Sequence, residues 1–430
     1  MKNQVNVGLL GFGTVGCGVY RILEKNQEEL IQRTGYGIKI QKILVRDRDK
    51  KRDLQVDTEL LTESVEDVTT NPEIDVVIEV MGGVEEAREY ILSALNHHKH
   101  VVTANKDLLA LYSGELLTTA ANHDCDLYYE ASVAGGIPII RSLVGGLASD
   151  RITKMMGIVN GTTNYILTRM TKEGADYQEV LKDAQALGFA EADPSGDVEG
   201  LDAARKMVIL STLGFSMKFN LKDVQVQGIS NISSEDIDYA GRLGYTIKLI
   251  GIAQKDEGRV EISVQPSLLP SDHPLSSVNN EFNAIYIYGE SIGETMFYGP
   301  GAGQLPTATA VVSDLISVVQ NMRMGVNGQS VVLPHNKTEL KNDEDVYSKY
   351  FLRLYLKDEA GAFSKVSALF GNYHISIEKL IQQPLKEKGA AEIVMVTHQT
   401  NRAAFNQVLS ELKGFDIVYD VISSYRIEGE

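Results

Sequence analysis

The sequence predicts an α/β protein of several domains. It should have a Rossmann-type parallel sheet at the N-terminal end, an α+β domain in the middle and a ferredoxin-like domain at the C-terminal end. Three observations support this class: the first 130 residues alternate short apolar runs with helical patterns, residues 136–300 mix longer helices with strands, and about the last 80 residues follow a β-α-β-β-α-β order. A length of 430 residues fits two or three domains.

In the N-terminal region, each apolar run is short enough to be a strand. The expected strands are 5–10, 38–45, 74–80, 100–103 and 127–130, and the expected helices run from the glycine-rich turn to about residue 33, from 84 to 96, and onward from a cap at Asp107. The run 74–80 is nearly all apolar, which is typical of a strand buried on both faces. Strands that alternate with helices predict a parallel, doubly wound sheet.

The rest of the chain changes in pattern. In the middle we expect helices at 162–170, 177–187 and 200–213, and strands at 152–159, 260–268 and 284–288. A helix at 308–320 follows the turn-rich segment 299–303 and should pack back on the first domain. The last region predicts strands at 350–356, 375–382, 392–397 and 415–421, with helices at 362–370 and 402–412. The expected domains are 1–130 with about 305–335, then 131–304, a polar linker at 336–348, and 349–430.

The amino-acid composition limits which binding partners and which cellular compartment are expected. With 41 basic and 58 acidic residues the net charge is -17, so the chain should be repelled by nucleic acid and by anionic membranes. No apolar run approaches the roughly 20 residues that span a bilayer. Cys17 and Cys125 cannot form a framework of several disulfides, and the N-terminal residues do not resemble a secretory signal. We therefore expect a cytoplasmic protein.

A glycine-rich loop follows the first strand and opens the first helix. It consists of Gly11, Phe12, Gly13, Thr14, Val15 and Gly16. In this pattern the first glycine permits a tight turn, the second lets the backbone approach a pyrophosphate, and the third allows close packing of helix on strand. The helix N-terminus supplies unpaired N–H donors. The loop predicts a dinucleotide site, and the alternative is a turn that merely needs glycines.

The residue after the second strand bears on which dinucleotide is bound. An acid at this place binds the ribose hydroxyls of NAD(H), whereas an arginine suits the 2′-phosphate of NADP(H). Arg46 comes first in a basic run that extends to Arg52, which favours NADP(H), with NAD(H) as the alternative. Asp47 and Asp49 within the run leave open that it is a solvated loop.

Two lysines lie where chemistry is expected. Lys106 follows the fourth strand, and ligands of doubly wound sheets bind at the carboxyl ends of strands; a surface lysine at a helix entry is the alternative. Lys206 lies four residues after Asp202 on one helical face, which could be an exposed ion pair. Alternatively, Glu191, Asp197 and Asp202 offer negative charge to an ammonium group and Lys206 acts as an acid–base group. Several carboxylates with two lysines suit a zwitterionic amino acid.

The segment 159–164 ends a strand and begins a helix. Its N–H groups and hydroxyls, that of Thr162 among them, could hold a substrate carboxylate or could simply cap the helix. Both interpretations stay open from the residues alone.

Together these motifs resemble the homoserine dehydrogenase family, in the monofunctional form with a C-terminal ACT domain. The resemblance covers nearly the whole chain. It rests on GFGTVG (11–16), TANKDLLA (103–110), YEASVAGGIPII (129–140), GIVNGTTNYIL (157–167), GFAEADPSGDVEGLDAARK (188–206) and GPGAGQLPTA (299–308). The segment 188–206 is long and highly specific.

The resemblance implies a reaction and a role for several residues. The reaction would be the reversible NAD(P)H-dependent reduction of L-aspartate 4-semialdehyde to L-homoserine, the branch step toward threonine, methionine and isoleucine. Lys206 would donate a proton to the carbonyl oxygen, Lys106 would contact cofactor and substrate, and Asp202 completes the expected catalytic group. The remaining implied sites are the substrate's amino-acid end at Gly188, Glu191 and Asp197, the nicotinamide at Gly303, and a monovalent cation, usually sodium, on the backbone carbonyls of Glu130, Val133, Gly135 and Ile137.

The resemblance also implies regulation and self-association. The segment 356–363 matches the strand, loop and helix at which ACT domains often bind amino acids, so feedback inhibition by L-threonine is expected; a module that only dimerises is the alternative. The family precedent is a homodimer or a homotetramer.

Two rival functions remain. One is aspartate-semialdehyde dehydrogenase chemistry, which needs a cysteine nucleophile with a histidine base, a setting that Cys125 lacks. The other is a cofactor-sensing regulator, which would need the glycine loop but not the lysines and carboxylates.

Overall fold

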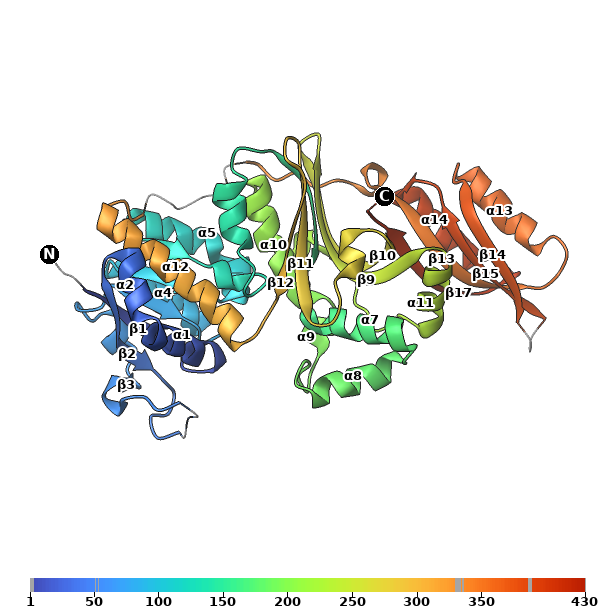
Figure 1. Ribbon diagram of the computed structural model, residues 1–430. Helices are drawn as coiled ribbons and strands as arrows, with labels where there is room; N and C mark the ends of the chain where they lie inside the picture. The colour runs from blue at the N-terminus through green and yellow to red at the C-terminus, as the bar shows by residue number, and fades with distance from the viewer. Residues whose placement is uncertain are drawn as a thin grey trace. The chain divides into compact units, whose positions relative to one another are not determined.

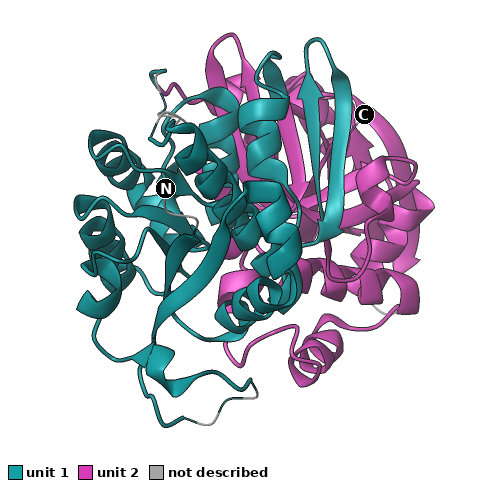
Figure 2. Ribbon diagram, turned by 60° about the vertical axis from the view of Figure 1, so that its left-hand side comes forward, with its two compact units in different colours: residues 1–153, 205–223, 283–337 teal, residues 154–204, 224–282, 338–430 magenta. Residues whose placement is uncertain are grey.

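The computed structural model describes residues 4–50, 52, 54–328, 334, 336–385 and 389–429, so Lys51 of the basic run and residues 329–333 and 335 lie outside the described part. The chain falls into two compact units (Figure 2). The first comprises residues 1–153, 205–223 and 283–337, and the second residues 154–204, 224–282 and 338–430.

The first unit contains a six-stranded parallel sheet. Its strand order is β3-β2-β1-β4-β5-β6, the order of a dinucleotide-binding fold. Figure 1 labels β1, β2 and β3 of this sheet. The strands are β1 (Gln4–Leu10), β2 (Gly37–Leu44), β3 (Leu61–Thr62), β4 (Val76–Glu79), β5 (His100–Thr103) and β6 (Leu127–Tyr128). Because β1 lies between β2 and β4, the loop after β1 sits at the point where the chain changes direction across the sheet.

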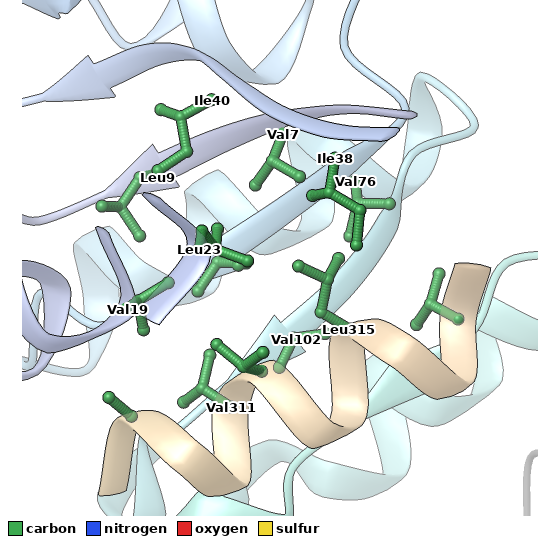
Figure 3. Close-up of a cluster of buried hydrophobic side chains, with 14 of the residues drawn as sticks. Val7, Leu9, Val19, Leu23, Ile38, Ile40, Val76, Val102, Val311 and Leu315 are labelled. Carbon is green, nitrogen blue, oxygen red and sulfur yellow. The ribbon is translucent and has the colours of Figure 1, made fainter. Parts of the chain in front are cut away.

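Helices from both ends of the first unit cover this sheet. They are α1 (Thr14–Lys25), α2 (Gln27–Thr34), α3 (Glu66–Thr69), α4 (Glu85–Asn96), α5 (Lys106–Asn122), α6 (Ile139–Arg141) and α12 (Gln304–Met324). Helix α12 lies beside α1 although it comes nearly 280 residues later in the chain. Val311 and Leu315 of α12 belong to the same buried cluster as Leu9 and Val19 (Figure 3). A Cβ on Gly18 would lie 2.8 Å from the Cβ of Ala308, so this glycine permits the close approach.

The second unit contains an α+β region. Its sheet follows the order β7-β9-β10-β17-β13-β15-β14, and β9 pairs with β10 along twelve antiparallel residue pairs. The elements before the last module are β7 (Ile152–Ile158), α7 (Gly161–Glu173), α8 (Tyr177–Ala186), α9 (Ser195–Val198), β8 (Gln225–Val226), α11 (Ser234–Arg242), β9 (Tyr245–Asp256) and β10 (Arg259–Pro270). Helix α10 (Leu201–Phe215) and strand β11 (Phe282–Gly289) cross the boundary between units, and β12 (Gly293–Pro300) belongs to the first unit.

The C-terminal module of the second unit has the predicted β-α-β-β-α-β order. It contains β13 (Tyr347–Lys357), α13 (Ala362–Asn372), β14 (Ile377–Leu385), β15 (Ala390–Thr397), β16 (Thr400–Asn401), α14 (Arg402–Leu412) and β17 (Val418–Ile427). Its sheet joins the rest of the unit because β17 pairs in parallel with β10, at Ser267 with Arg426 and at Leu268 with Ile427.

Two groups of buried ion pairs hold this module to the rest of the second unit. Arg353 on β13 bridges Asp236 on α11 at 3.1 Å and Glu392 on β15 at 2.6 Å. In the other group Glu261 on β10 accepts from Arg402 at 3.1 Å and also from Arg426. The module is therefore attached by charge as well as by strand pairing.

The predicted fold class is confirmed, while several details differ. The first helix ends at Lys25 and a second begins at Gln27, rather than one helix reaching residue 33. Helix α5 is capped by Asn105, whose side chain accepts from the N–H of Leu108, and not by Asp107. The prediction also missed β9, β12 and α11. Among the described residues, no helix has the length and apolarity needed to cross a membrane.

Candidate active site

The glycine loop after β1 has the geometry that a pyrophosphate requires. Gly11 has a φ of +101°, and a Cβ there would lie 2.8 Å from the Cα of Met81. A Cβ on Gly16 would lie 2.4 Å from the carbonyl oxygen of Gly11, so both positions need glycine. Gly13 faces open space and is the N-cap of α1 without a side-chain cap. The first N–H groups of α1 therefore remain available to an anion.

The basic segment after β2 separates Arg46 from its neighbours. The Arg52 guanidinium donates to the carbonyls of Asp47 (2.6 Å) and Lys50 (2.9 Å), and that of Arg48 donates to the carbonyl of Thr58 (3.1 Å). These arginines stabilise the loop itself. Arg46 is exposed at the end of β2, the place from which a side chain can meet an adenosine phosphate.

A cavity of about 310 Å³ lies at the carboxyl ends of β4 and β5. Its lining comes from the first unit alone and includes four residues that the sequence predicted, Val15, Lys106, Gly135 and Lys206. The other lining residues are Glu79, Val80, Gly82, Ala104, Asn105, Asp107, Ala131, Ser132, Ala134, Gly301, Ala302 and Thr307. Gly303 does not line it but is the N-cap of α12, directly after Ala302.

The two predicted lysines line this same cavity from different helices. Lys106 is the first residue of α5, and Lys206 lies in α10 with a relative exposure of 9%. Their sequence neighbours are joined, because the Nε of Arg205 lies 2.9 Å from a carboxylate oxygen of Asp107. That ion pair ties α10 to the first turn of α5, the two helices from which Lys206 and Lys106 line the cavity.

The loop 130–141 forms another wall of the cavity, and the side chain of Glu130, at its start, binds the backbone at its end. The buried Glu130 carboxylate accepts from the N–H groups of Ile140 (2.7 Å) and Arg141 (2.9 Å). Asp314 on α12 accepts the N–H of Glu130 at 2.7 Å and bridges Arg141 at 2.7 Å. Burial, opposed in part by Arg141, raises the pKa of Asp314 to about 7.

A cation at this loop would have to be held by backbone oxygens. Among the described residues, no group of three or more His, Cys, Asp or Glu side chains is arranged to bind a metal. Ala134 and Gly135 both have a φ of +54°, and the carbonyls of Glu130 and Ile137 each accept one backbone N–H, which leaves a second lone pair. Neutral oxygens of this kind fit a hard cation of low charge. The Glu130 side chain is already engaged, so only its carbonyl fits that role.

In the second unit, the Asn160 side chain joins two of the three predicted carboxylates, Asp197 and Asp202. Its Nδ2 donates to Asp197 at 2.7 Å and to Asp202 at 2.8 Å, while its Oδ1 caps α7 by accepting from Thr163 N–H at 2.9 Å. The Thr162 hydroxyl lies 3.1 Å from Asp197 and 2.6 Å from the Phe189 carbonyl. The motif therefore does cap the helix, and it also orders a carboxylate cluster.

Two further predicted substrate residues lie on a loop of the second unit. Gly188 has a φ of +78°, which favours glycine, and Glu191 is exposed. The Gln185 side chain donates to the Glu191 carbonyl at 3.0 Å, so the backbone of this loop is held while the Glu191 carboxylate stays accessible.

Comparison with known proteins identifies the family. The model of the homoserine dehydrogenase family matches residues 138–316, that of the homoserine dehydrogenase NAD-binding domain residues 11–130, and that of the ACT domain residues 350–416. A homoserine dehydrogenase of Bacillus subtilis is 58% identical over 426 residues, which cover 99% of this chain and 98% of that protein. The chain belongs to the homoserine dehydrogenase family.

Solved structures of homoserine dehydrogenases agree with this assignment. One from Thiobacillus denitrificans is 39% identical and superimposes with a TM-score of 0.93, and the match covers 99% of this chain and 98% of that chain. A hyperthermophilic archaeal homoserine dehydrogenase in complex with NADPH is 28% identical, covers 73% of this chain and 97% of its own, and gives a TM-score of 0.61. The protein is thus an oxidoreductase with a nucleotide-binding domain and an ACT domain.

The ACT domain of the chain has a cavity of its own, of about 250 Å³. It lies where β13 passes through a loop into α13, the segment singled out in the sequence, and Gln382 of β14 and Ala391 of β15 complete its lining. Gly361, with a φ of +88°, is the N-cap of α13, and the first turn of the helix lines the cavity, so its unpaired backbone N–H groups lie there.

Sequence reasoning missed a buried acidic group of the cavity, Glu79. It ends β4, is fully buried and lines the cavity, and burial raises its pKa against the lowering effect of its hydrogen bonds. A signal was present: Glu79 is the charged residue within the otherwise apolar run 76–80, at the end of the strand where ligands bind.

Proposed function

We propose that the protein catalyses the reversible NAD(P)H-dependent reduction of L-aspartate 4-semialdehyde to L-homoserine. The observation that carries this proposal is the cavity in which Val15 of the glycine loop, Lys106 and Lys206 meet at the carboxyl ends of β4 and β5. Family membership supports the same reaction. On this basis the protein would serve the branch toward threonine, methionine and isoleucine, in the cytoplasm.

In the proposed mechanism Lys206 is the general acid. The nicotinamide, when bound, supplies the hydride to the aldehyde carbon or removes it from the alcohol. Negative charge develops on the substrate oxygen as hydride arrives, and an ammonium in a buried setting both stabilises that charge and donates the proton. Lys106 lines the same cavity and is proposed to contact cofactor and substrate.

The substrate's amino-acid end is assigned to carboxylates and amides. Glu191, Asp197 and Asp202 offer negative charge to its ammonium group, and Thr162 and Gly188 offer polar and backbone groups. The hydrogen bonds from Asn160 to Asp197 and Asp202 support this assignment, because they fix two carboxylates before substrate arrives. Preorganised charge binds a zwitterion without a further cost of ordering.

NADP(H) is the favoured cofactor and NAD(H) the alternative. The glycine loop, Gly11 to Gly16, would hold the pyrophosphate, Gly303 would lie near the nicotinamide, and the exposed Arg46 would meet the 2′-phosphate. Support comes from the engagement of Arg48 and Arg52 within their own loop and from the NADPH complex of the archaeal relative. We assign a sodium ion to the carbonyls of Glu130, Val133, Gly135 and Ile137.

The ACT cavity is proposed to bind L-threonine as a feedback inhibitor. Its size, and the helix N-terminus beside it, suit the carboxylate of a small amino acid. Strand β14 ends the order of the sheet whereas β17 pairs with β10, so association of ACT domains in a dimer or tetramer would use β14.

The reaction is tested by the absorbance of the reduced nicotinamide. Purified protein receives L-homoserine with NADP⁺ or NAD⁺ at mildly alkaline pH, with and without sodium chloride and with and without L-threonine. We expect homoserine-dependent reduction that is faster with NADP⁺, depends on sodium and is inhibited by threonine. Folded protein that binds NADPH but shows no homoserine-dependent reduction would contradict the dehydrogenase and favour a regulator.

A further inference from the structure

Glu79 is a buried carboxylate whose hydrogen bonds come from neutral donors. It ends β4, opposite Thr103 at the end of β5, and its side chain is fully buried. The Thr103 hydroxyl donates to one carboxylate oxygen at 2.6 Å, and the N–H groups of Met81 and Gly82 donate to the other at 2.9 and 3.3 Å. Burying a carboxylate is costly unless it is hydrogen-bonded, so these contacts fix its position.

The hydrogen bonds continue to the start of α5. Thr103 Oγ1 accepts the N–H of Asn105 at 3.0 Å, and Asn105 Nδ2 donates to the carbonyl of Gly83 at 2.7 Å. The circuit thereby closes on the same turn, 81–83, from which it began. It joins the segment after β4 to the segment after β5, with Glu79 and Thr103 between them.

Both ends of this circuit touch the predicted machinery. Lys106 follows Asn105 and begins α5, whose first turn Asn105 caps through Leu108 N–H. At the other end, Met81 packs on the glycine loop so closely that a Cβ on Gly11 would lie 2.8 Å from its Cα. A shift of either segment would displace an element that faces the cofactor.

We propose that Glu79 is a positioning residue of the active site. Through Thr103 and Asn105 it fixes the position of Lys106, and through the N–H groups of Met81 and Gly82 it fixes the turn that packs against the glycine loop. The proposal rests on the proposed function of Lys106. The charged residues around the cavity are Glu79, Lys106, Asp107 and Lys206, and Asp107 is paired with Arg205.

The first test removes the hydroxyl that links the two segments. Thr103→Val keeps the shape of the side chain but deletes its hydrogen bonds to Glu79 and Asn105, and we expect kcat with L-homoserine to fall about tenfold, since small displacements of catalytic groups cost rate. The NADPH Kd, measured by fluorescence, should change less than about threefold because Met81 and Gly82 keep their acceptor. Thr103→Ser retains the hydroxyl and should restore kcat to within about twofold.

Thr34 offers a matched control. It is also fully buried in the first unit, its hydroxyl donates to the Leu30 carbonyl at 2.7 Å, and it accepts the N–H of Tyr36, two residues on, as Thr103 does from Asn105. Thr34→Val should cost comparable stability without changing kcat. If Thr103→Val lowers thermal stability as Thr34→Val does and leaves kcat equally unchanged, the proposal is overturned.

The second test separates this proposal from the reaction itself. Glu79→Leu keeps a side chain of similar size but offers no acceptor, so the Thr103 hydroxyl and the N–H groups of Met81 and Gly82 all lose their partner. We expect kcat to fall and the NADPH Kd to rise about tenfold. If the wild-type protein does not oxidise homoserine, the proposed function fails, but the NADPH titration still tests the role of Glu79. An NADPH Kd for Glu79→Leu equal to that for Thr34→Val would overturn that role.

Discussion

Buried charge is stabilised differently at two places in the molecule. One is the cavity of the first unit, and the other is the junction at which the ACT module meets the rest of the second unit. At the cavity, Glu79 is stabilised by a hydroxyl and by backbone N–H groups. At the junction, Arg353 lies between Asp236 and Glu392, and the side chains of all three are less than 10% exposed. The carboxylate beside the cavity is thus held in place by neutral donors, whereas charge at the junction is neutralised by opposite charge and serves attachment.

The comparison predicts that the two regions fail differently. Loss of a cavity charge should reduce catalysis and leave the fold intact, because the neighbouring groups can be solvated through the cavity. Loss of one member of a junction pair should reduce stability, since the remaining charge stays buried without its partner.

Lys206→Ala should have the largest effect. We expect kcat to fall by 10² to 10⁴, the magnitude typical of a general acid, with little change in the NADPH Kd. Steady-state rates with homoserine and a fluorescence titration measure both quantities. Near-normal turnover would remove Lys206 from the acid role, and an equal loss of cofactor binding would assign it to binding instead.

Arg353→Met should give the converse result. It leaves Asp236 and Glu392 buried, so the free energy of unfolding should fall by about 3–5 kcal/mol, while kcat per folded chain changes little. Urea unfolding followed by fluorescence measures the loss. Arg242→Met is the matched control. Arg242 lies on α11, as Asp236 does, but its ion pair with Asp238 is exposed and should contribute about 0.5 kcal/mol or less.

Lys248 is an exception within the second unit, since neutral groups hold it as they hold Glu79. It is 2% exposed and donates to Asn164 Oδ1 at 3.0 Å and to the Val278 carbonyl at 2.6 Å; burial, with Lys172 nearby, lowers its pKa to about 8. The unfolded chain then binds more protons between pH 8 and 10.5. The stability of the wild type relative to Lys248→Met should therefore rise with pH in that window, by up to about 1.4 kcal/mol per unit.

This difference is measured by unfolding at pH 7.5, 9 and 10. The exposed lysine of α8 provides the control: Lys182→Met should show no such slope. A wild-type advantage that stays constant with pH would mean that Lys248 keeps the pKa of an exposed lysine.

Glu191→Gln should affect binding more than turnover. The exposed carboxylate loses its charge but not its shape, and we expect the homoserine KM to rise about tenfold with kcat reduced less, as for one charge-assisted hydrogen bond. Saturation curves at fixed NADP⁺ separate the two constants. An unchanged KM would remove Glu191 from the ammonium site.

Arg46→Ala should have the smallest effect and a selective one. Loss of a 2′-phosphate contact should weaken NADP⁺ about tenfold and leave NAD⁺ unchanged. The ratio of kcat/KM for the two cofactors measures this directly. An equal loss for both would place Arg46 in the loop's own structure rather than at the phosphate.

The sequence predicts much of the fold because local patterns determine the alternating elements around Gly11 and along 74–80. Strand-end position and helical spacing with Asp202 single out Lys106 and Lys206 but leave open a surface lysine and an exposed ion pair, and their expected roles come from the family resemblance. The predicted cap of α5 was wrong because Asn105 and Asp107 are both suitable capping residues. Only the structure shows that the Asn105 side chain is the one that accepts from the N–H of Leu108. Glu79 was missed because a single acid in an apolar strand is read as part of the strand.

Long-range pairing was beyond such reasoning. The sequence predicts that the last strand ends at residue 421, whereas β17 continues to Ile427, because its final residues pair with β13 on one side and, at Arg426 and Ile427, with β10 on the other. No local periodicity encodes a partner about 160 positions away. The same holds for Asp236, which looks like an ordinary residue of a helix N-terminus until Arg353 lies against it.

The return of α12 to α1 has a consequence for how the chain folds as it is synthesised. Residues 308–319 of α12 complete the core that β1 and α1 begin, so this core remains open until more than 300 residues have left the ribosome. Contacts of such sequence separation slow folding because the loop must close before they form. The face of α1 that α12 covers stays exposed meanwhile, and exposed apolar surface of this kind is what chaperones bind. The domain that begins the chain is among the last to be finished.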